Sequence, residues 1–299
     1  MVRTSAVVIF SLVAATIAAA QNMPLVEEKS TRVSDHVYVI IGFPNIAIVV
    51  GDRATLVVDT GLGPRNGATA MRVMKKLATA QKLFLTTTHF HAEHTAGEAG
   101  FPVDTIIIRP AIQQAEVEKS AAAMIARFST MSAQNRDLLA GVQLRAPDMV
   151  FDNEAKLDLG GVTARLIWLG AAHTKGDEII FVEPDRTLIP GDIVQDKIVP
   201  RVNRDEGSVK SWLAVLDKIE PLKPRYIVPD HGELGDGSLI AKERAFIIDL
   251  QSRALALKRQ NVSVADAGKQ LLGEFTAKYP GWSNMNLVES FVERVYEEN

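Results

Sequence analysis

A cluster of metal-binding side chains at the end of an apolar segment is the feature that most constrains what this chain can fold into. Residues His89 to His94 read His-Phe-His-Ala-Glu-His and directly follow the strand-like segment 83–88. Side chains two apart in an extended segment point the same way, so His89 and His91 can hold one ion. Glu93 and His94 then turn toward a neighbouring site. Three of the chain's six histidines lie here, so we expect the fold to present this strand end to a metal.

The ligand types indicate which metal. Neutral imidazole and carboxylate are the ligands expected for zinc, with iron or manganese possible. The alternative interpretation is a loop of three solvated histidines beside an acid. We expect the metal site, because chance or core packing rarely produces such a cluster.

Residues 1–20 are expected to be a signal peptide. Arg3 supplies a positive charge, the apolar segment from Ala6 to Ile17 is short for a membrane span, and Ala18 to Ala20 offers a small-residue cleavage site. An uncleaved N-terminal anchor is the alternative. We therefore expect a periplasmic or secreted protein that has no stable membrane association after cleavage.

Composition excludes several classes of protein. The chain of 299 residues has no cysteine, so disulfides, thiolate ligands and a cysteine nucleophile are excluded, and stability must come from an apolar core. The net charge is −3 and no long basic run stands out, so nucleic acid is not an expected partner. We expect a small-molecule substrate, and the sequence carries no signal for an oligomeric state.

The strand and helix patterns occur twice along the chain. The first half is expected to contain strands at 37–41, 45–50, 54–59 and 103–108, and helices at 66–80 and 111–140. The second half is expected to contain antiparallel strands at 155–159, 162–169, 178–182 and 187–190, a helix at 209–219 and a strand at 226–228. Two such halves predict an α+β fold, with two sheets packed face to face and helices outside.

Two helical segments stand apart from the candidate site. Met124, Phe128 and Met131 form an apolar stripe that indicates core or lid packing rather than a cofactor site. Residues 237–299 are predicted to be wholly helical, and they carry none of the candidate ligands. We expect a C-terminal extension that packs on, or supports a lid of, a catalytic domain at residues 21–236.

Three further metal-binding side chains lie where predicted strands give way to glycine-containing loops. They are His173, Asp192 and His231. Strand ends of this kind can direct side chains into one cleft at a sheet edge. Taken singly, each residue has a simpler interpretation as a loop histidine or a turn-capping aspartate. Together with the hexapeptide they predict one site.

These motifs, with Asp59 in Val-Val-Asp-Thr-Gly, resemble those of the metallo-β-lactamase fold superfamily from about Val37 to His231. The resemblance implies a four-layer αββα sandwich with a metal cleft at one edge of the paired sheets. It also implies a role for Asp59, which would orient a ligand histidine through its other ring nitrogen. The implied ligands are His89, His91 and His173 for the first metal, Glu93, His94 and His231 for the second, and Asp192 as the bridge between them.

Two residues depart from patterns within that superfamily. Glu93 stands where the hexapeptide normally carries aspartate, so its carboxylate reaches further into the cleft and the second metal can be shifted, weaker or absent. Asp192 stands where the β-lactamases usually carry cysteine or serine. An aspartate there is the pattern of glyoxalase II-like thioesterases, lactonases and related hydrolases.

The resemblance implies hydrolysis by a metal-bound hydroxide, because paired cations lower the pKa of a bridging water toward about 7. Asp192 and Glu93 are the candidate catalytic residues, with Glu93 able to orient the water or protonate the leaving group. We expect an exported hydrolase with two zinc ions that cleaves an ester, thioester, lactone or amide bond, including a β-lactam. An iron-dependent oxidoreductase of the sulfur dioxygenase type and a non-catalytic metal-binding protein are the alternatives.

The motifs do not specify the substrate. Lys197 and Arg201 follow Asp192 closely in the sequence and are candidates for binding a substrate carboxylate at the cleft mouth. A solvated surface role is the alternative for both residues.

Overall fold

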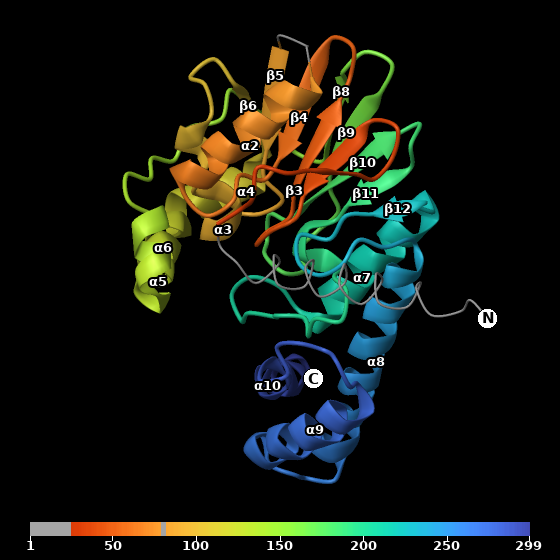
Figure 1. The fold of residues 1–299 in the computed structure, drawn as a ribbon. Helices are drawn as coiled ribbons and strands as arrows, with labels where there is room; N and C mark the ends of the chain where they lie inside the picture. The colour runs from red at the N-terminus through yellow and green to blue at the C-terminus, as the bar shows by residue number, and fades with distance from the viewer. Residues whose placement is uncertain (1–24, 79–81) are drawn as a thin grey trace, which may run out of the picture.

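Two β-sheets packed face to face, with helices on both outer sides, form the core of the protein (Figure 1). The computed structural model describes residues 25–78 and 82–299, so the predicted signal peptide at 1–20 lies outside the described residues. The α+β fold class and the αββα layering are confirmed. Within the described residues, no helix has both the length and the apolar character needed to cross a membrane.

Over the described residues the first sheet contains seven strands in the order β1-β2-β3-β4-β5-β6-β7. Strands β1 to β4 pair antiparallel, whereas β4 to β7 pair parallel. The strands β2 to β4 were predicted, and β1 was not. Parallel neighbours need long crossover connections, which place helices over the sheet. The strands span Thr31–Arg32, Val37–Ile40, Ile46–Val50, Ala54–Val58, Lys82–Thr86, Ile106–Pro110 and Met149–Phe151.

The second sheet contains five strands over the described residues, in the order β12-β11-β10-β9-β8. Strands β8 to β11 pair antiparallel, as predicted, and β12 pairs parallel to β11. The strands β8 to β12 span Glu154–Asp158, Thr163–Trp168, Glu178–Glu183, Thr187–Ile189 and Tyr226–Ile227.

Successive side chains along a strand point to opposite faces of the sheet, so a strand such as β4 contacts the other sheet on one face and the helices on the other. Leu56 and Val58 of β4 point into the cluster between the sheets, where they meet Leu166 and Ile180 of the second sheet. Val57, between them in sequence, points the other way into a cluster with the first helical layer. Because both faces of β4 are covered, all of its residues are buried.

The first helical layer contains α2 (Pro64–Leu77), α3 (Ala92–Thr95), α4 (Ala111–Glu116), α5 (Ala122–Met131) and α6 (Ala133–Leu138). The single helix predicted for 111–140 changes to π-helical geometry at one turn and is broken at one residue. One turn of π-helix at Val117–Ala121 separates α4 from α5. Ser132 then adopts an extended backbone and its side chain accepts a hydrogen bond from the Asn135 N–H, which starts α6.

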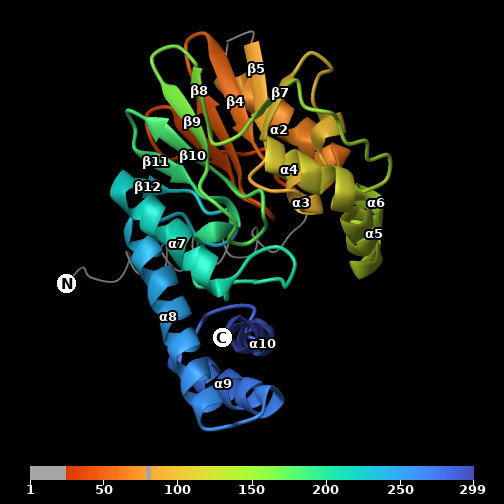
Figure 2. The ribbon, with the colours of Figure 1, turned by 180° about the vertical axis from the view of Figure 1, so that it is seen from behind.

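The second helical layer contains α7 (Val209–Ile219) and leads into α8 (Ser238–Arg259), α9 (Val264–Lys278) and α10 (Leu287–Glu298). Trp212 of α7 and Phe246 of α8 are fully buried in one cluster, which also holds Phe275 and Phe291. Figure 2 shows α9 and α10 beyond the end of the sheets, joined to them by the long α8. The C-terminal extension therefore shares its core with the second sheet.

Candidate metal centre

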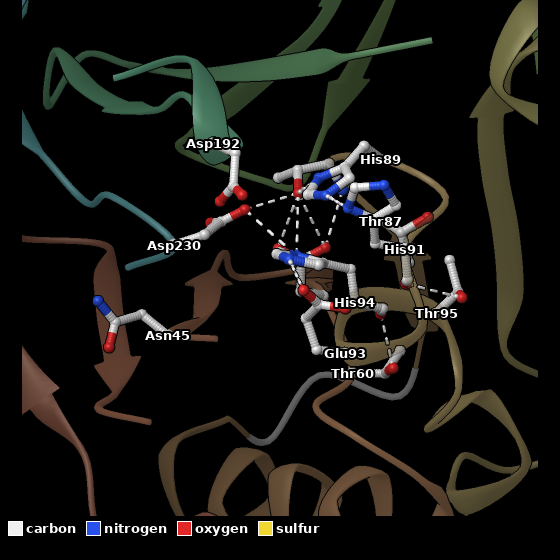
Figure 3. Close-up of polar contacts among 12 residues, drawn as sticks. Asn45, Thr60, Thr87, His89, His91, Glu93, His94, Thr95, Asp192 and Asp230 are labelled. Carbon is white, nitrogen blue, oxygen red and sulfur yellow. Dashed lines mark hydrogen bonds and ion pairs between the residues drawn. The ribbon is translucent and has the colours of Figure 1, made fainter. Parts of the chain in front are cut away.

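The candidate ligands lie on loops that leave neighbouring strands at one end of the sandwich. His89 and His91 follow β5, and His91 is the N-cap residue of α3, so Glu93 and His94 fall in its first turn. This change from extended to helical backbone turns the last two side chains toward a second position, as the spacing predicts. Figure 3 shows His89, His91 and His94 gathered close to Asp192.

The first group contains His89, His91 and His173, all buried. The Nε2 atom of His89 lies 3.0 Å from Nδ1 of His91. The Nε2 atom of His173, which follows β9, lies 3.3 Å from the same Nδ1. Three ring nitrogens that converge in this way can bind one cation. The structure therefore brings together the three residues proposed for the first metal.

The second group contains Glu93, His94 and His231. The Oε1 atom of Glu93 lies 3.9 Å from Nε2 of His94, a separation that suits two ligands of one cation with bonds of about 2 Å. Glu93 Oε2 and His94 Nε2 are buried and have no hydrogen-bond partner among the described residues. Burying polar atoms unpaired is costly, so these two atoms fit a metal.

Asp192 lies between the two groups. It belongs to a short 3₁₀ helix, Gly191–Ile193, directly after β11. One carboxylate oxygen is 3.4 Å from Nε2 of His173, and the other is 3.4 Å from Nε2 of His231. Each oxygen thus faces one group, which is the position that a bridging ligand requires.

Two carboxylates face the other ring nitrogen of His94. Its Nδ1 lies 3.2 Å from Asp59 and 3.4 Å from Asp230. Thr88 links both acids, since its N–H donates to Asp59 at 2.8 Å and its hydroxyl donates to Asp230 at 2.6 Å. Asp59 lies where the resemblance implies. Asp230 was missed, although its place beside His231 in the sequence was a usable signal.

A backbone carbonyl orients His173. The Nδ1 atom of its ring lies 3.1 Å from the carbonyl oxygen of Arg201. A carbonyl only accepts hydrogen bonds, so Nδ1 carries the proton and Nε2 is free to bind a cation. Arg201 therefore has a role at this site through its backbone, whatever its side chain binds.

The protonation states of the first group and of Asp192 favour binding of a cation. Burial lowers the pKa of His89 and His91 well below the usual value, so both rings stay neutral at pH 7. Burial opposes ionisation of Asp192, but the neighbouring His231 and His173 outweigh it and lower the pKa of Asp192 to about 2. The bridge position therefore carries a full negative charge.

Two members of the second group, Glu93 and His94, hold their protons more tightly than usual, whereas burial lowers the pKa of His231. Burial raises the pKa of Glu93. Burial also opposes the charging of His94, but Asp59 and Asp230 outweigh it and raise the pKa of His94 well above its usual value. A cation must displace these protons, so metal binding at this group depends on pH.

A cavity of about 660 Å³ opens beside both groups. Lys197 and Arg201, the candidate substrate-binding residues, are exposed at this cavity and line it. Its apolar lining includes Phe43, Met124, Phe128, Met131, Val199 and Leu287. The stripe on α5 thus serves as a cavity wall, and none of its three residues is fully buried.

Comparison with known proteins gives one family. A sequence model described as "Metallo-beta-lactamase superfamily" matches residues 39–231, a span that ends at the last candidate ligand. A curated relative, "Metallo-beta-lactamase type 2" of Bacteroides fragilis, is 25% identical over 114 residues, which are 37% of this chain and 46% of the relative. The match therefore spans less than half of that relative's length.

Solved structures share the fold. A sec-alkylsulfatase from Pseudomonas sp. has a TM-score of 0.68 at 16% identity, over 90% of this chain and 50% of its own. A metallo-β-lactamase from Pontibacter korlensis has a TM-score of 0.58 at 19% identity, over 73% of this chain and 98% of its own. The sulfatase match covers more of this chain than residues 1–236 can supply, so it extends into the C-terminal helices.

Proposed function

We propose that this chain, which belongs to the metallo-β-lactamase superfamily, is a metal-dependent hydrolase of a small molecule. The observation that carries the proposal is the placement of Asp192, with one oxygen 3.4 Å from each of the two histidine groups. Zinc fits the imidazole and carboxylate donors best, with iron or manganese as alternatives. The two groups support two ions per chain.

The reaction would follow from what each side chain holds in place. Bound divalent cations supply an activated water at neutral pH and polarise a substrate carbonyl. His89, His91 and His173 would hold the first ion and Glu93, His94 and His231 the second. Asp192 would fix their separation, and Asp59 and Asp230 would orient His94. Glu93 would orient the attacking water or pass its proton to the leaving group.

The bond cleaved is proposed to be an ester, thioester, lactone or amide, including a β-lactam. Lys197 and Arg201 would bind an anionic group of the substrate at the cavity mouth. A sec-alkyl sulfate belongs among the test substrates as well, because the sulfatase shares its fold with 90% of this chain.

The decisive experiment combines metal analysis with a substrate panel. Purified protein is analysed for zinc, iron and manganese, then assayed on chromogenic esters, thioesters, lactones, β-lactams and a sec-alkyl sulfate, with and without a chelator. We expect hydrolysis that the chelator abolishes and added zinc restores. Stoichiometric iron with oxygen consumption would instead support the oxidoreductase alternative, and metal binding without turnover would support the non-catalytic one.

We also propose export to the periplasm or the medium, based on Arg3, the apolar segment and the Ala18 to Ala20 cleavage site. Mass spectrometry of the mature N-terminus tests this. A cytoplasmic protein that still begins at Met1 would contradict it.

A further inference from the structure

The C-terminal extension forms backbone hydrogen bonds with the loop that follows Asp192. The N–H of Ser283 donates to the carbonyl of Lys197 at 2.9 Å, and the N–H of Val199 donates to the carbonyl of Ser283 at 3.2 Å. These bonds form a parallel β-bridge between Ile198 and Ser283. The extension is therefore fixed relative to the metal centre.

A buried carboxyl on α8 makes a second attachment. Glu243 is 1% exposed, and it accepts a hydrogen bond from the backbone N–H of Gln195 in the same loop. Two separate elements of the extension, α8 and the segment before α10, thus hold residues 195–199. A segment held in this way can form a rigid cavity wall.

The cavity has apolar lining from two segments that are far apart in the sequence. On one side, Met124, Phe128 and Met131 recur at helical spacing on α5, and all three line the cavity. Met131 is 53% exposed. Leu287, at the start of α10, lines the same cavity and also packs in the hydrophobic cluster of the extension. Figure 2 shows α5 and α10 projecting beyond the sheets from different parts of the chain.

We propose that α5 and the C-terminal extension together bind a hydrocarbon chain or ring system attached to the scissile bond. This inference rests on the proposed hydrolase function and adds a substrate class to it. His91, Glu93 and Asp192 line the same cavity. An apolar group bound in the cavity can therefore belong to the same molecule as a scissile bond at the metal centre. A cavity of about 660 Å³ is large enough for such a group.

The physical basis is the removal of apolar surface from water. Each methylene buried against the apolar side chains of the cavity is expected to raise kcat/KM about fourfold until the cavity is filled. Arg127, Lys197 and Arg201 line the cavity together with the acidic Asp196 and Glu233. The three cationic side chains would interact with an anionic group of the substrate.

The test uses the zinc-loaded full chain and p-nitrophenyl esters with linear acyl groups of increasing length. The variants are Met131→Gln, which keeps size but adds polarity, and Leu287→Ala. The matched control is Ile248→Gln, since Ile248 is 44% exposed on α8 and does not line this cavity. Thermal melting of each variant shows whether it is folded.

We expect kcat/KM to rise with acyl length in the native protein and in Ile248→Gln, and to rise less steeply in Met131→Gln and Leu287→Ala. Calorimetry with butyrate and decanoate gives a readout independent of turnover: the native protein and the control should bind decanoate more tightly than butyrate, and this preference should be smaller in Met131→Gln and Leu287→Ala. Length-independent hydrolysis together with equal binding of the two acids would overturn the inference and leave the hydrolase proposal intact. If no substrate of the full panel under the proposed function is hydrolysed but decanoate still binds more tightly than butyrate, the hydrolase proposal is overturned and the apolar binding site stands.

Discussion

Replacement of Glu93 by glutamine removes one negative charge from the second group and preserves side-chain size. Glu93 is 5% exposed, its Oε2 atom makes no hydrogen bond among the described residues, and its Oε1 atom lies 3.9 Å from His94 Nε2. Removing one partner of a buried charge pair costs roughly 3–5 kcal/mol. At about 1.4 kcal/mol per factor of ten, metal affinity at this group should fall by about two to four powers of ten.

The same substitution should have the opposite effect on the metal-free protein. Because burial raises the pKa of Glu93, its ionised form costs stability above its unfolded pKa, near 4.5. Glutamine carries no charge to bury. We therefore expect metal-free Glu93→Gln to melt no lower than the native protein at pH 8, and to gain less melting temperature on addition of zinc.

The assay measures metal content, melting with and without zinc, and turnover for Glu93→Gln and for the control Glu93→Asp. The aspartate keeps the charge but retracts the carboxylate by one methylene, so we expect metal retention with an altered rate or metal preference. Displacement by about 1 Å can cost a hundredfold. Native turnover in Glu93→Gln would refute a catalytic role and leave His89, His91 and His173 as the proposed metal site.

Three further substitutions test two residues of the centre and Glu116, which ends α4 and accepts hydrogen bonds from the backbone N–H groups of Lys175 and Gly176. Asp192→Ala should remove one ion and lower turnover on the order of a hundredfold or more; full metal content at native rate would exclude a bridging role. Asp230→Asn should lower the affinity for the second ion by roughly 10–100-fold in chelator competition, because His94 loses a hydrogen-bond partner. An affinity equal to that of the native protein would contradict this. Burial raises the pKa of Glu116 to about 7, so native stability should fall relative to Glu116→Gln as the pH rises from about 4.5 to 7; parallel urea-unfolding curves would be the contrary result.

Local patterns predicted most elements of the fold. The three strand-like segments at 37–41, 45–50 and 54–59 match β2 to β4, and the helix expected at 209–219 matches α7. The parallel order from β4 to β7 was not predicted, because strand pairing over long sequence separation leaves no local pattern. The strand expected at 103–108 begins at Ile106, since Val103 is 92% exposed and lies before the sheet.

The candidate ligands could be found from sequence because each follows a strand with a recognisable pattern. Residues that act through tertiary contacts could not. The carbonyl of Arg201 reaches His173 across 28 positions, and Leu287 reaches the cavity from an extension that carries no ligand. Lys197 was selected by proximity in sequence to Asp192, and it does line the cavity.

Each of the two candidate ligand groups takes residues from both halves of the chain. His89 and His91 come from a loop of the first sheet, whereas His173 comes from a loop of the second, and the same division separates His94 from His231. Neither half has a full ligand set until the sheets pack through the cluster around Leu56 and Ile180. Free energy released by the proposed metal binding would then be folding free energy for the paired sheets. Since the C-terminal extension is bonded to the loop after Asp192, that stabilisation should extend to the wall that contains Leu287.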